Sequence, residues 1–314
     1  MKGLTVKDKQ LILKSDLTKP EPRKGEVLVR VISSSVNQID QEFAQGKYDW
    51  LLKLSGGNHL VKTGIEFSGV IAEDGQGFSK GDHVFGYVHL TKGIKAHQEY
   101  LAINANYLAK MPKNISFDEA ASLPLGSLTS FVALTELGGV RKGTNLLIIG
   151  ATGGLGVYAV QLANLFGATV TAVAGDNQEE FLKSIGATNV INYKETPLDK
   201  IAEQFDVVLD LSNKKLFKEI KSLLKENGKF IPAEPNKHFF DLFLSLFKTM
   251  KTKYLYVDRG DKNKLEKITK WIEKGELKPF VDNVYSLENY QQAFDRLSAK
   301  GRQGRIVLNI SELA

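Results

Sequence analysis

A glycine-rich segment in the middle of the chain has the residue types and spacing that bind a diphosphate. Residues 146–157 read LLIIGATGGLGV, so an apolar strand runs straight into a glycine-rich turn and then into a helix. Gly153 lets the backbone approach a pyrophosphate, and Gly156 lets the helix pack closely on the strand. Free amides near Gly154 and Leu155, together with the helix dipole, would hold the anion. The match to a strict GxGxxG pattern is partial, and a purely structural turn is the alternative.

The next expected strand, residues 169–174, bears on the choice between NADPH and NADH. An NAD enzyme usually ends this strand with Asp or Glu, which bonds the ribose 2′-hydroxyl. Here Gly175 follows the strand, which leaves room for a 2′-phosphate and favours NADPH, with NADH as the alternative. We expect Asp176 to cap the following helix. Three further side chains could contact a phosphate: Asn177, Tyr193 and Lys194.

The chain lacks the side chains from which a catalytic zinc site is built. It contains no cysteine, and its five histidines do not form a ligand-spaced pair. A catalytic zinc needs three protein ligands, so we expect no metal site. Without a Lewis acid, the alkoxide-like transition state of alcohol oxidation is poorly stabilised. A quinone or an α,β-unsaturated carbonyl is the better hydride acceptor, because hydrogen bonds can stabilise the delocalised negative charge that forms on its oxygen.

The elements that must position these groups change in character along the chain. The first ~115 residues are expected to form short strands separated by glycine-marked turns, as in a small barrel or open β domain. A capping box at residues 116–119 predicts the start of a helix. From residue 145 to 232, strands and helices alternate, which predicts a parallel sheet covered on both faces. The expected elements after residue 258 are a helix at 262–274, a strand at 281–286, a helix at 287–298 and a strand at 305–310.

Five segments resemble motifs of the zinc-free quinone oxidoreductase branch of the medium-chain dehydrogenase/reductase superfamily, which includes zeta-crystallin-like and enone reductase-like members. The segments are 35–40 (SVNQID), 64–70 (GIEFSGV), 119–129 (EAASLPLGSLT), 181–187 (FLKSIGA) and 304–308 (GRIVL). The resemblance implies an α/β fold in which a doubly wound Rossmann sheet is inserted into a GroES-like, β-rich catalytic domain. The implied catalytic domain is 1–120 plus 259–314, and the dinucleotide-binding domain is 121–258.

The resemblance also implies roles for individual residues. Asn37 and Asp40 would lie by the nicotinamide ribose and the substrate, and Arg305 would approach the cofactor. The remaining implied cofactor contacts are Thr129 near the nicotinamide, Thr152, Gly153, Gly154 and Leu155 at the pyrophosphate, and Tyr193 beside the adenosine phosphate. The alternatives are that Asn37 and Asp40 are turn residues and that Arg305 makes a surface ion pair.

This chain departs from the family pattern at several positions. Zinc-dependent relatives carry Gly-His-Glu where this chain has residues 64–66, Gly-Ile-Glu, and isoleucine cannot ligate a metal. NADPH-binding members often carry Ser, and Arg or Lys, at the positions of Gly175 and Asn177. Members often carry Tyr or Lys at the position of Glu42. Tyr48 is a candidate proton donor, with a packing aromatic as the alternative.

Composition indicates an ordinary globular protein. The 314 residues are 42% hydrophobic and 25% charged, with a net charge of +6. Lysines alternate with acids, for example at residues 261–267, so the basic stripe of a nucleic-acid binder is absent from the sequence pattern. The N-terminal residues lack a signal-peptide pattern, and the longest apolar stretch, 239–247, is too short to span a bilayer. We expect a cytoplasmic location and no integral membrane segment, and the family resemblance suggests a homodimer.

The sequence thus predicts hydride transfer from NADPH to a small quinone or α,β-unsaturated carbonyl without zinc. The alternative is a non-catalytic NADPH-binding protein on the same fold, acting as a redox sensor or a nucleic-acid binder. The departure at Glu42 keeps this alternative open.

Overall fold

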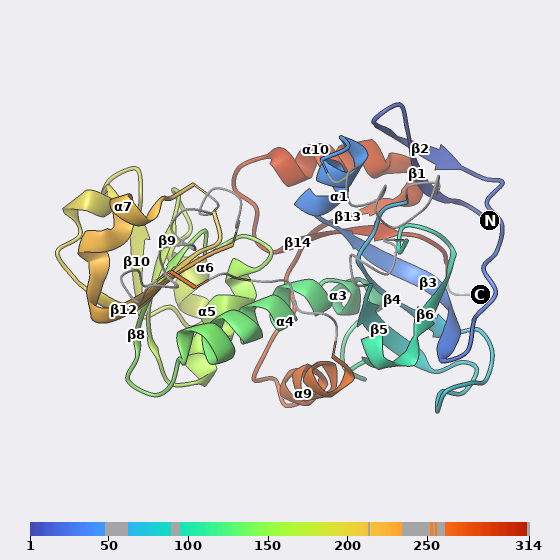
Figure 1. Ribbon diagram of the computed structural model, residues 1–314, viewed down its shortest axis with the longest axis horizontal. Coiled ribbons are helices and arrows are strands. Elements are labelled where there is room, and N and C mark those ends of the chain that lie inside the picture. Colours follow the sequence, from blue (N-terminus) through green and yellow to red (C-terminus); the bar gives the residue numbers. More distant parts are fainter. Residues whose placement is uncertain are drawn as a thin grey trace. The chain divides into compact units, whose positions relative to one another are not determined.

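The structure, a computed structural model, describes residues 1–47, 62–88, 95–212, 214–233, 252–253, 255 and 261–312. The chain divides into two units (Figure 1). The split unit comprises Met1–Leu125 and Arg259–Ala314, and the central unit comprises Gly126–Asp258. The middle of the sequence is therefore inserted into a unit that is built from both ends of the chain.

A five-stranded parallel sheet forms the central unit. Its strands are β8 (Asn145–Ile149), β9 (Thr169–Ala174), β10 (Asn189–Asn192), β11 (Phe205–Asp210) and β12 (Leu224–Pro232). They lie in the order β10-β9-β8-β11-β12, so the direction of winding reverses between β8 and β11. Sheets of this kind bind ligands at the carboxyl ends of their strands, next to such a reversal. The predicted Rossmann sheet within a GroES-like fold is confirmed.

Short helices precede or connect the strands of the central unit. They are α4 (Pro124–Val132), a π-helix (Ala133–Gly138), α5 (Gly156–Leu165), α6 (Glu179–Ser184), a 3-10 helix (Leu198–Lys200), α7 (Phe217–Ile220) and a 3-10 helix (Lys221–Leu223). The helical segment before β12 is short, because the chain already enters β12 at Leu224, which pairs with Phe205 of β11. Ile149, Val208 and Phe230 pack in one buried cluster of this unit.

The split unit is built on β-sheets. A two-stranded sheet contains β1 (Gly3–Lys7) and β2 (Gln10–Lys14). A seven-stranded sheet has the order β13-β14-β3-β4-β5-β7, and β6 pairs with β3 off this path. Its strands are β3 (Glu26–Val36), β4 (Glu66–Ile71), β5 (His83–Tyr87), β6 (Tyr100–Asn104), β7 (Leu108–Lys110), β13 (Val281–Ser286) and β14 (Arg305–Asn309). The C-terminal strand β14 thus pairs with β3 from the N-terminal part of the chain.

Helices of the split unit pack beside this sheet. They are α1 (Gln38–Ala44), a 3-10 helix (Ala105–Tyr107), α3 (Phe117–Ala121), α9 (Lys262–Glu273), a 3-10 helix (Leu287–Asn289) and α10 (Tyr290–Ser298). The capping box predicted at the start of α3 is confirmed: the amide of Glu119 donates to Ser116 Oγ at 3.2 Å, and the amide of Ser116 donates to Glu119 Oε2 at 2.8 Å.

One helical stretch, Phe117–Gly138, is long and apolar enough to cross a bilayer by length and composition. However, 78% of its apolar window is buried within the protein. Burial of this kind is what a core helix of a folded domain shows, so the stretch is weak evidence for a membrane span.

Candidate functional site

The glycine-rich turn lies between β8 and α5, at the carboxyl edge of the central sheet. The amides of Gly150 and Ala151 donate to the carbonyl of Val173 at 3.2 and 3.3 Å, which fastens the turn to β9. The amide of Gly153 closes the turn by donating to Gly150 O at 3.2 Å. Helix α5 then begins at Gly156, so the first helical turn faces the reversal point of the sheet.

Three amides of this turn are available to a ligand. Within the described residues, no hydrogen-bond acceptor is found for the backbone N–H groups of Thr152, Gly154 and Leu155. Adjacent unsatisfied amides at a helix N-terminus bind phosphate oxygens, and the helix dipole adds to the attraction. The residues predicted to hold the pyrophosphate therefore form a cradle that fits a diphosphate.

Two glycines of the turn differ in what surrounds them. A Cβ atom on Gly156 would lie 2.3 Å from Gly150 O and 2.5 Å from two backbone atoms of Ala151, so close packing within the turn requires glycine there. A Cβ atom on Gly153 would meet only Gly150 O, at 3.4 Å, an ordinary contact. Gly156 is thus required by the fold, whereas the space over Gly153 is open to a ligand.

A buried hydroxyl lies on the helix beside the turn. Thr129 of α4 is 2% exposed, and its Oγ1 has no hydrogen-bond partner among the described residues. The next residue, Ser130, donates its hydroxyl to Leu155 O at 2.9 Å, which ties α4 to the turn. Burying a hydroxyl without a hydrogen-bond partner costs free energy of folding, so a bound ligand that hydrogen-bonds to Thr129 Oγ1 would remove this cost.

The residues expected near an adenosine phosphate gather at the ends of β9 and β10. The Tyr193 amide donates to Ala174 O at 3.1 Å, and the ring is 48% exposed. Asn177 has a φ of 59°, in the left-handed region. The expectation that Asp176 caps the next helix is wrong: α6 has Gln178 at its N-cap position without a side-chain cap, and Asp176 pairs with Lys194 instead.

A second cluster of polar side chains is buried in the split unit. Asn37, Asp40, Glu66 and Arg305 are each at most 5% exposed. Arg305 forms an ion pair with Glu66, and it also donates to Asn37 Oδ1. Asn37 Nδ2 in turn donates to Glu66 Oε1 at 3.1 Å. The structure thus brings Asn37 and Arg305 together, and the alternative of a surface ion pair for Arg305 does not hold.

Asp40 is held by backbone amides. Its two carboxylate oxygens accept from Asn37 N at 2.9 Å and from Gly64 N at 2.7 Å. Burial raises the pKa of Asp40, whereas His97, the two amides and Arg305 oppose the shift. The contact that Asp40 would make with a substrate stays a prediction.

Sequence reasoning missed two members of this cluster. Glu66 lies on β4, and its Oε2 accepts from the amide of Leu125 at 2.7 Å. A carboxylate inside an apolar strand indicates a buried cation partner, and this signal was available in the sequence. His97 gave no such signal, since its ring contacts Thr63 Oγ1 at 2.9 Å and Ser35 O at 3.1 Å only through the tertiary fold.

Two sequence predictions concern the segment after α1. Tyr48, the candidate proton donor, lies outside the described residues. Glu42 forms an ion pair with Lys47 at 2.8 Å.

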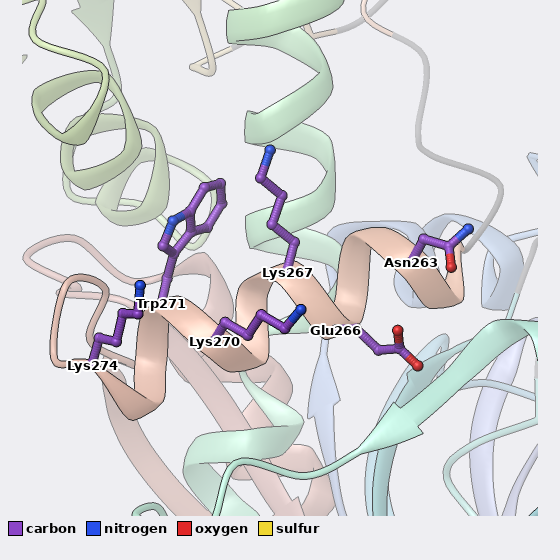
Figure 2. A pocket seen from close by; sticks show the side chains of 6 residues that line it. All are labelled: Asn263, Glu266, Lys267, Lys270, Trp271 and Lys274. Atoms are coloured by element: carbon purple, nitrogen blue, oxygen red, sulfur yellow. The ribbon is translucent and has the colours of Figure 1, made fainter.

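A pocket of about 510 Å³ lies along helix α9 of the split unit (Figure 2). Figure 2 shows that Lys267 and Trp271 project from the same side of this helix, and the lysine ammonium lies 5.2 Å from the indole ring centre. The lining residues are Asn263, Glu266, Lys267, Lys270, Trp271 and Lys274. None of them belongs to the predicted site, so the pocket plays no part in the assignments above.

Two family models match the chain. One is described as an alcohol dehydrogenase GroES-like domain and matches residues 23–113. The other is described as a zinc-binding dehydrogenase and matches residues 185–308.

Several oxidoreductases are similar in sequence over most of the chain. A 2-methylene-furan-3-one reductase from Solanum lycopersicum is 28% identical, over 95% of this chain and 75% of the relative. A chloroplast envelope quinone oxidoreductase homolog from Arabidopsis thaliana is 29% identical, over 92% of this chain and 91% of the relative. Among solved structures, the quinone oxidoreductase from Coxiella burnetii superposes with a TM-score of 0.88 at 26% identity, over 99% of both chains.

The zinc in the second model's description does not fit the residues present. The chain has no cysteine, and Ile65 is buried directly before Glu66. The Glu66 carboxylate already forms an ion pair with Arg305. Among the residues that the structure describes, no group of three or more His, Cys, Asp or Glu side chains could hold a metal ion.

Proposed function

Because the chain belongs to the medium-chain dehydrogenase/reductase superfamily, we propose that this oxidoreductase uses NADPH to reduce a small quinone or α,β-unsaturated carbonyl without zinc. The observation that carries the proposal is the turn after β8, with its amides at Thr152, Gly154 and Leu155 free of acceptors among the described residues. The names of the relatives support this acceptor class, since they include a quinone oxidoreductase homolog and a 2-methylene-furan-3-one reductase.

In this proposal the central unit binds the cofactor. The amides of Thr152, Gly154 and Leu155 hold the pyrophosphate, with Gly153 giving the backbone close access to it. Thr129 donates or accepts through its hydroxyl near the nicotinamide. Asn177 and Tyr193 lie beside the adenosine phosphate. When bound, NADPH supplies the hydride, and the protein positions it against the acceptor.

The split unit contributes the polar groups of Asn37 and Arg305. Burial lowers the pKa of Arg305 to about 10, so the guanidinium stays protonated at neutral pH. A buried cation balanced by one carboxylate is a fixed electrostatic feature that does not reorganise during a reaction. We propose that Asn37 contacts the nicotinamide ribose, with Asp40 holding the backbone around it through the amides of Asn37 and Gly64. We propose Tyr48 as the proton donor.

A pair of glycine substitutions tests the cofactor site. Gly153→Ala should leave the melting temperature nearly unchanged, because its Cβ meets no atom closer than 3.4 Å. It should still weaken NADPH binding by about tenfold or more, since the methyl group enters the space of the pyrophosphate. Gly156→Ala should lower both stability and binding, because its Cβ collides with Gly150 and Ala151. Calorimetric titration with NADPH and thermal melts measure both quantities.

The outcomes separate a ligand site from a structural turn. If Gly153→Ala binds NADPH as the unmodified protein does, the turn does not hold the pyrophosphate. If the unmodified protein binds neither NADPH nor NADH, the proposed function is wrong as a whole.

An acceptor panel tests the proposed reaction. We expect NADPH oxidation with 9,10-phenanthrenequinone or 2-cyclohexenone, and no NADP⁺ reduction with simple primary alcohols, because no Lewis acid stabilises an alkoxide. Tight NADPH binding without turnover of any conjugated acceptor would contradict the proposed activity and favour a non-catalytic role.

We further propose a cytoplasmic homodimer. The names of some relatives include 'mitochondrial' or 'chloroplastic'. Fractionation of the native cells therefore tests the proposed compartment. Light scattering of the purified protein measures the oligomeric state directly, and a mass of one chain in solution would contradict the dimer.

A further inference from the structure

We propose that the ion pair between Asp176 and Lys194 sets the selectivity between NADPH and NADH, with Lys194 attracting a 2′-phosphate and Asp176 opposing it. This inference rests on the proposed function. It concerns two residues of the central unit that lie at the ends of neighbouring strands.

The register of the sheet places the two residues side by side. Strands β9 and β10 are parallel, and Asn192, the last residue of β10, is opposite Ala174, the last residue of β9. Asp176 and Lys194 each follow two residues after these strand ends. The residues that precede Asp176 and Lys194 are also close to each other, since a Cβ atom on Gly175 would lie 3.4 Å from the Tyr193 hydroxyl.

Asn192 lies between the two residues and also donates through Nδ2 to Glu195 Oε1 at 2.8 Å, so four side-chain hydrogen bonds organise this edge. Lys194 Nζ donates to Asp176 Oδ2, and Asn192 Nδ2 donates to Asp176 Oδ1 at 3.0 Å. The amide of Lys194 donates to Asn192 Oδ1 at 3.1 Å. The bond from Lys194 lowers the pKa of Asp176, and the same bond raises the pKa of Lys194. Both side chains are therefore charged at neutral pH.

The location of the pair gives it a role in cofactor choice. In a doubly wound sheet, the end of the strand after the phosphate-binding turn lies beside the adenosine ribose. An acid there accepts a hydrogen bond from the 2′-hydroxyl of NADH, and a cation there attracts the 2′-phosphate of NADPH. This chain has one of each, joined to one another at the same edge.

The pair is exposed enough to open for a ligand. The side chain of Lys194 is 51% exposed, and that of Asp176 is 48% exposed. Solvent screens such pairs, so breaking one costs little. A 2′-phosphate offers Lys194 a more highly charged partner, but Asp176 then lies next to the phosphate as a like charge. We therefore expect the unmodified protein to prefer NADPH only modestly, by about tenfold or less.

Single substitutions should move selectivity in opposite directions. Asp176→Asn keeps the shape and the bond from Asn192 but removes the repulsion, and should tighten NADPH binding about fivefold without tightening NADH binding. Lys194→Gln should weaken NADPH binding about tenfold, with NADH little changed. The melting temperature should stay the same for both, because both side chains are exposed.

Calorimetric titration of the full chain with NADPH and NADH is the measurement. The fragments 2′,5′-ADP and 5′-AMP serve as additional probes, since they differ only at the ribose 2′ position and do not require the nicotinamide. The matched controls are Lys225→Gln and Asp206→Asn, an ion pair at 3.0 Å with both side chains 40% exposed. Asp206 lies near the amino end of β11, at the opposite edge of the same parallel sheet, so neither control should change the NADPH-to-NADH ratio.

The results distinguish this inference from the proposed function. A ratio of NADPH to NADH affinity that stays within about twofold of the unmodified value in both Asp176→Asn and Lys194→Gln overturns the inference alone, provided that dinucleotides bind. The inference is also overturned if the control pair shifts the ratio equally. If no variant and no unmodified protein binds either dinucleotide, the proposed function fails and the inference fails with it.

Discussion

Glu66 and Arg305 are each other's counter-ion in the interior of the split unit. Their side chains are 0% and 6% exposed, and they belong to strands β4 and β14. Ser35, near the end of β3, and Asn37, just before α1, complete the cluster by bonding to both charges. Taking two charges out of water is expensive, so the cluster is stable only while both are present.

Removal of one charge should therefore cost more than removal of both. We expect Arg305→Met to lower the free energy of unfolding by about 3–5 kcal/mol, because it leaves the Glu66 carboxylate buried without its cation. The double variant Arg305→Met with Glu66→Gln should recover much of this loss. Urea denaturation of four proteins measures it: the unmodified protein, Arg305→Met, Glu66→Gln and the double variant. A loss in the double variant equal to the sum of the two single losses would contradict a coupled pair.

The buried His97 makes the free energy of unfolding of the split unit depend on pH. Burial lowers the pKa of His97, so the folded ring stays neutral where the unfolded ring takes up a proton. As the pH falls below about 6.5, the unfolded state gains protons and the free energy of unfolding drops, by up to about 1.4 kcal/mol per pH unit from this group. Asp40 acts in the opposite direction, because its raised pKa lets the folded state take up a proton first.

His97→Asn should therefore flatten the loss of stability between pH 7 and pH 5. The groups that face the ring are Thr63, the Ser35 carbonyl, Asp40 and Phe294. Denaturation curves across this range, compared between the variant and the unmodified protein, give the slopes. Equal slopes in the two proteins would show that His97 is not the acid-sensitive group.

At the scale of elements, helix α4 packs against the turn that precedes α5. A Cβ atom on Gly126 of α4 would lie 2.5 Å from the Tyr158 ring and 2.6 Å from Gly154 O. Ser130 on the same helix donates to Leu155 O. The shape of the proposed phosphate cradle thus depends on α4 as well as on its own glycines.

Gly126→Ala should displace α4 from the turn. We expect a loss of stability of about 1–3 kcal/mol from overpacking, together with weaker NADPH binding, because the amides at Gly154 and Leu155 would move with the turn. Ser130→Ala, which removes only the bond to Leu155 O, should cost about 1 kcal/mol. Thermal melts and calorimetry measure both effects, and normal binding by a destabilised Gly126→Ala would show that the cradle does not depend on this contact.

For the molecule as a whole, metal removal is the decisive test of a zinc-free reaction. We expect dialysis against EDTA to leave turnover of 9,10-phenanthrenequinone unchanged, because the residues around Ile65 and Glu66 do not form a zinc site. Elemental analysis should find far less than one zinc per chain. Added Zn²⁺ serves as the control, and activity that falls on chelation and returns with Zn²⁺ would contradict the proposal.

Local features of the sequence determined most of the secondary structure and the type of fold. The capping box at Ser116, the strand Thr169–Ala174 and the glycine-rich turn after Ile149 depend on residues close together in the chain, so their patterns could be read directly. Alternation of strands and helices then implied the parallel sheet, because parallel strands need crossover connections.

The tertiary structure alone decided which side chains meet. Ser35 and Arg305 are 270 positions apart, and only the pairing of β3 with β14 brings them together. Asp176 fits a helix cap by local chemistry, yet the parallel register of β9 and β10 places Lys194, 18 positions further on, beside it. Local propensity acts through neighbouring backbone, whereas buried and paired charges depend on long-range strand register, and no single segment encodes that register.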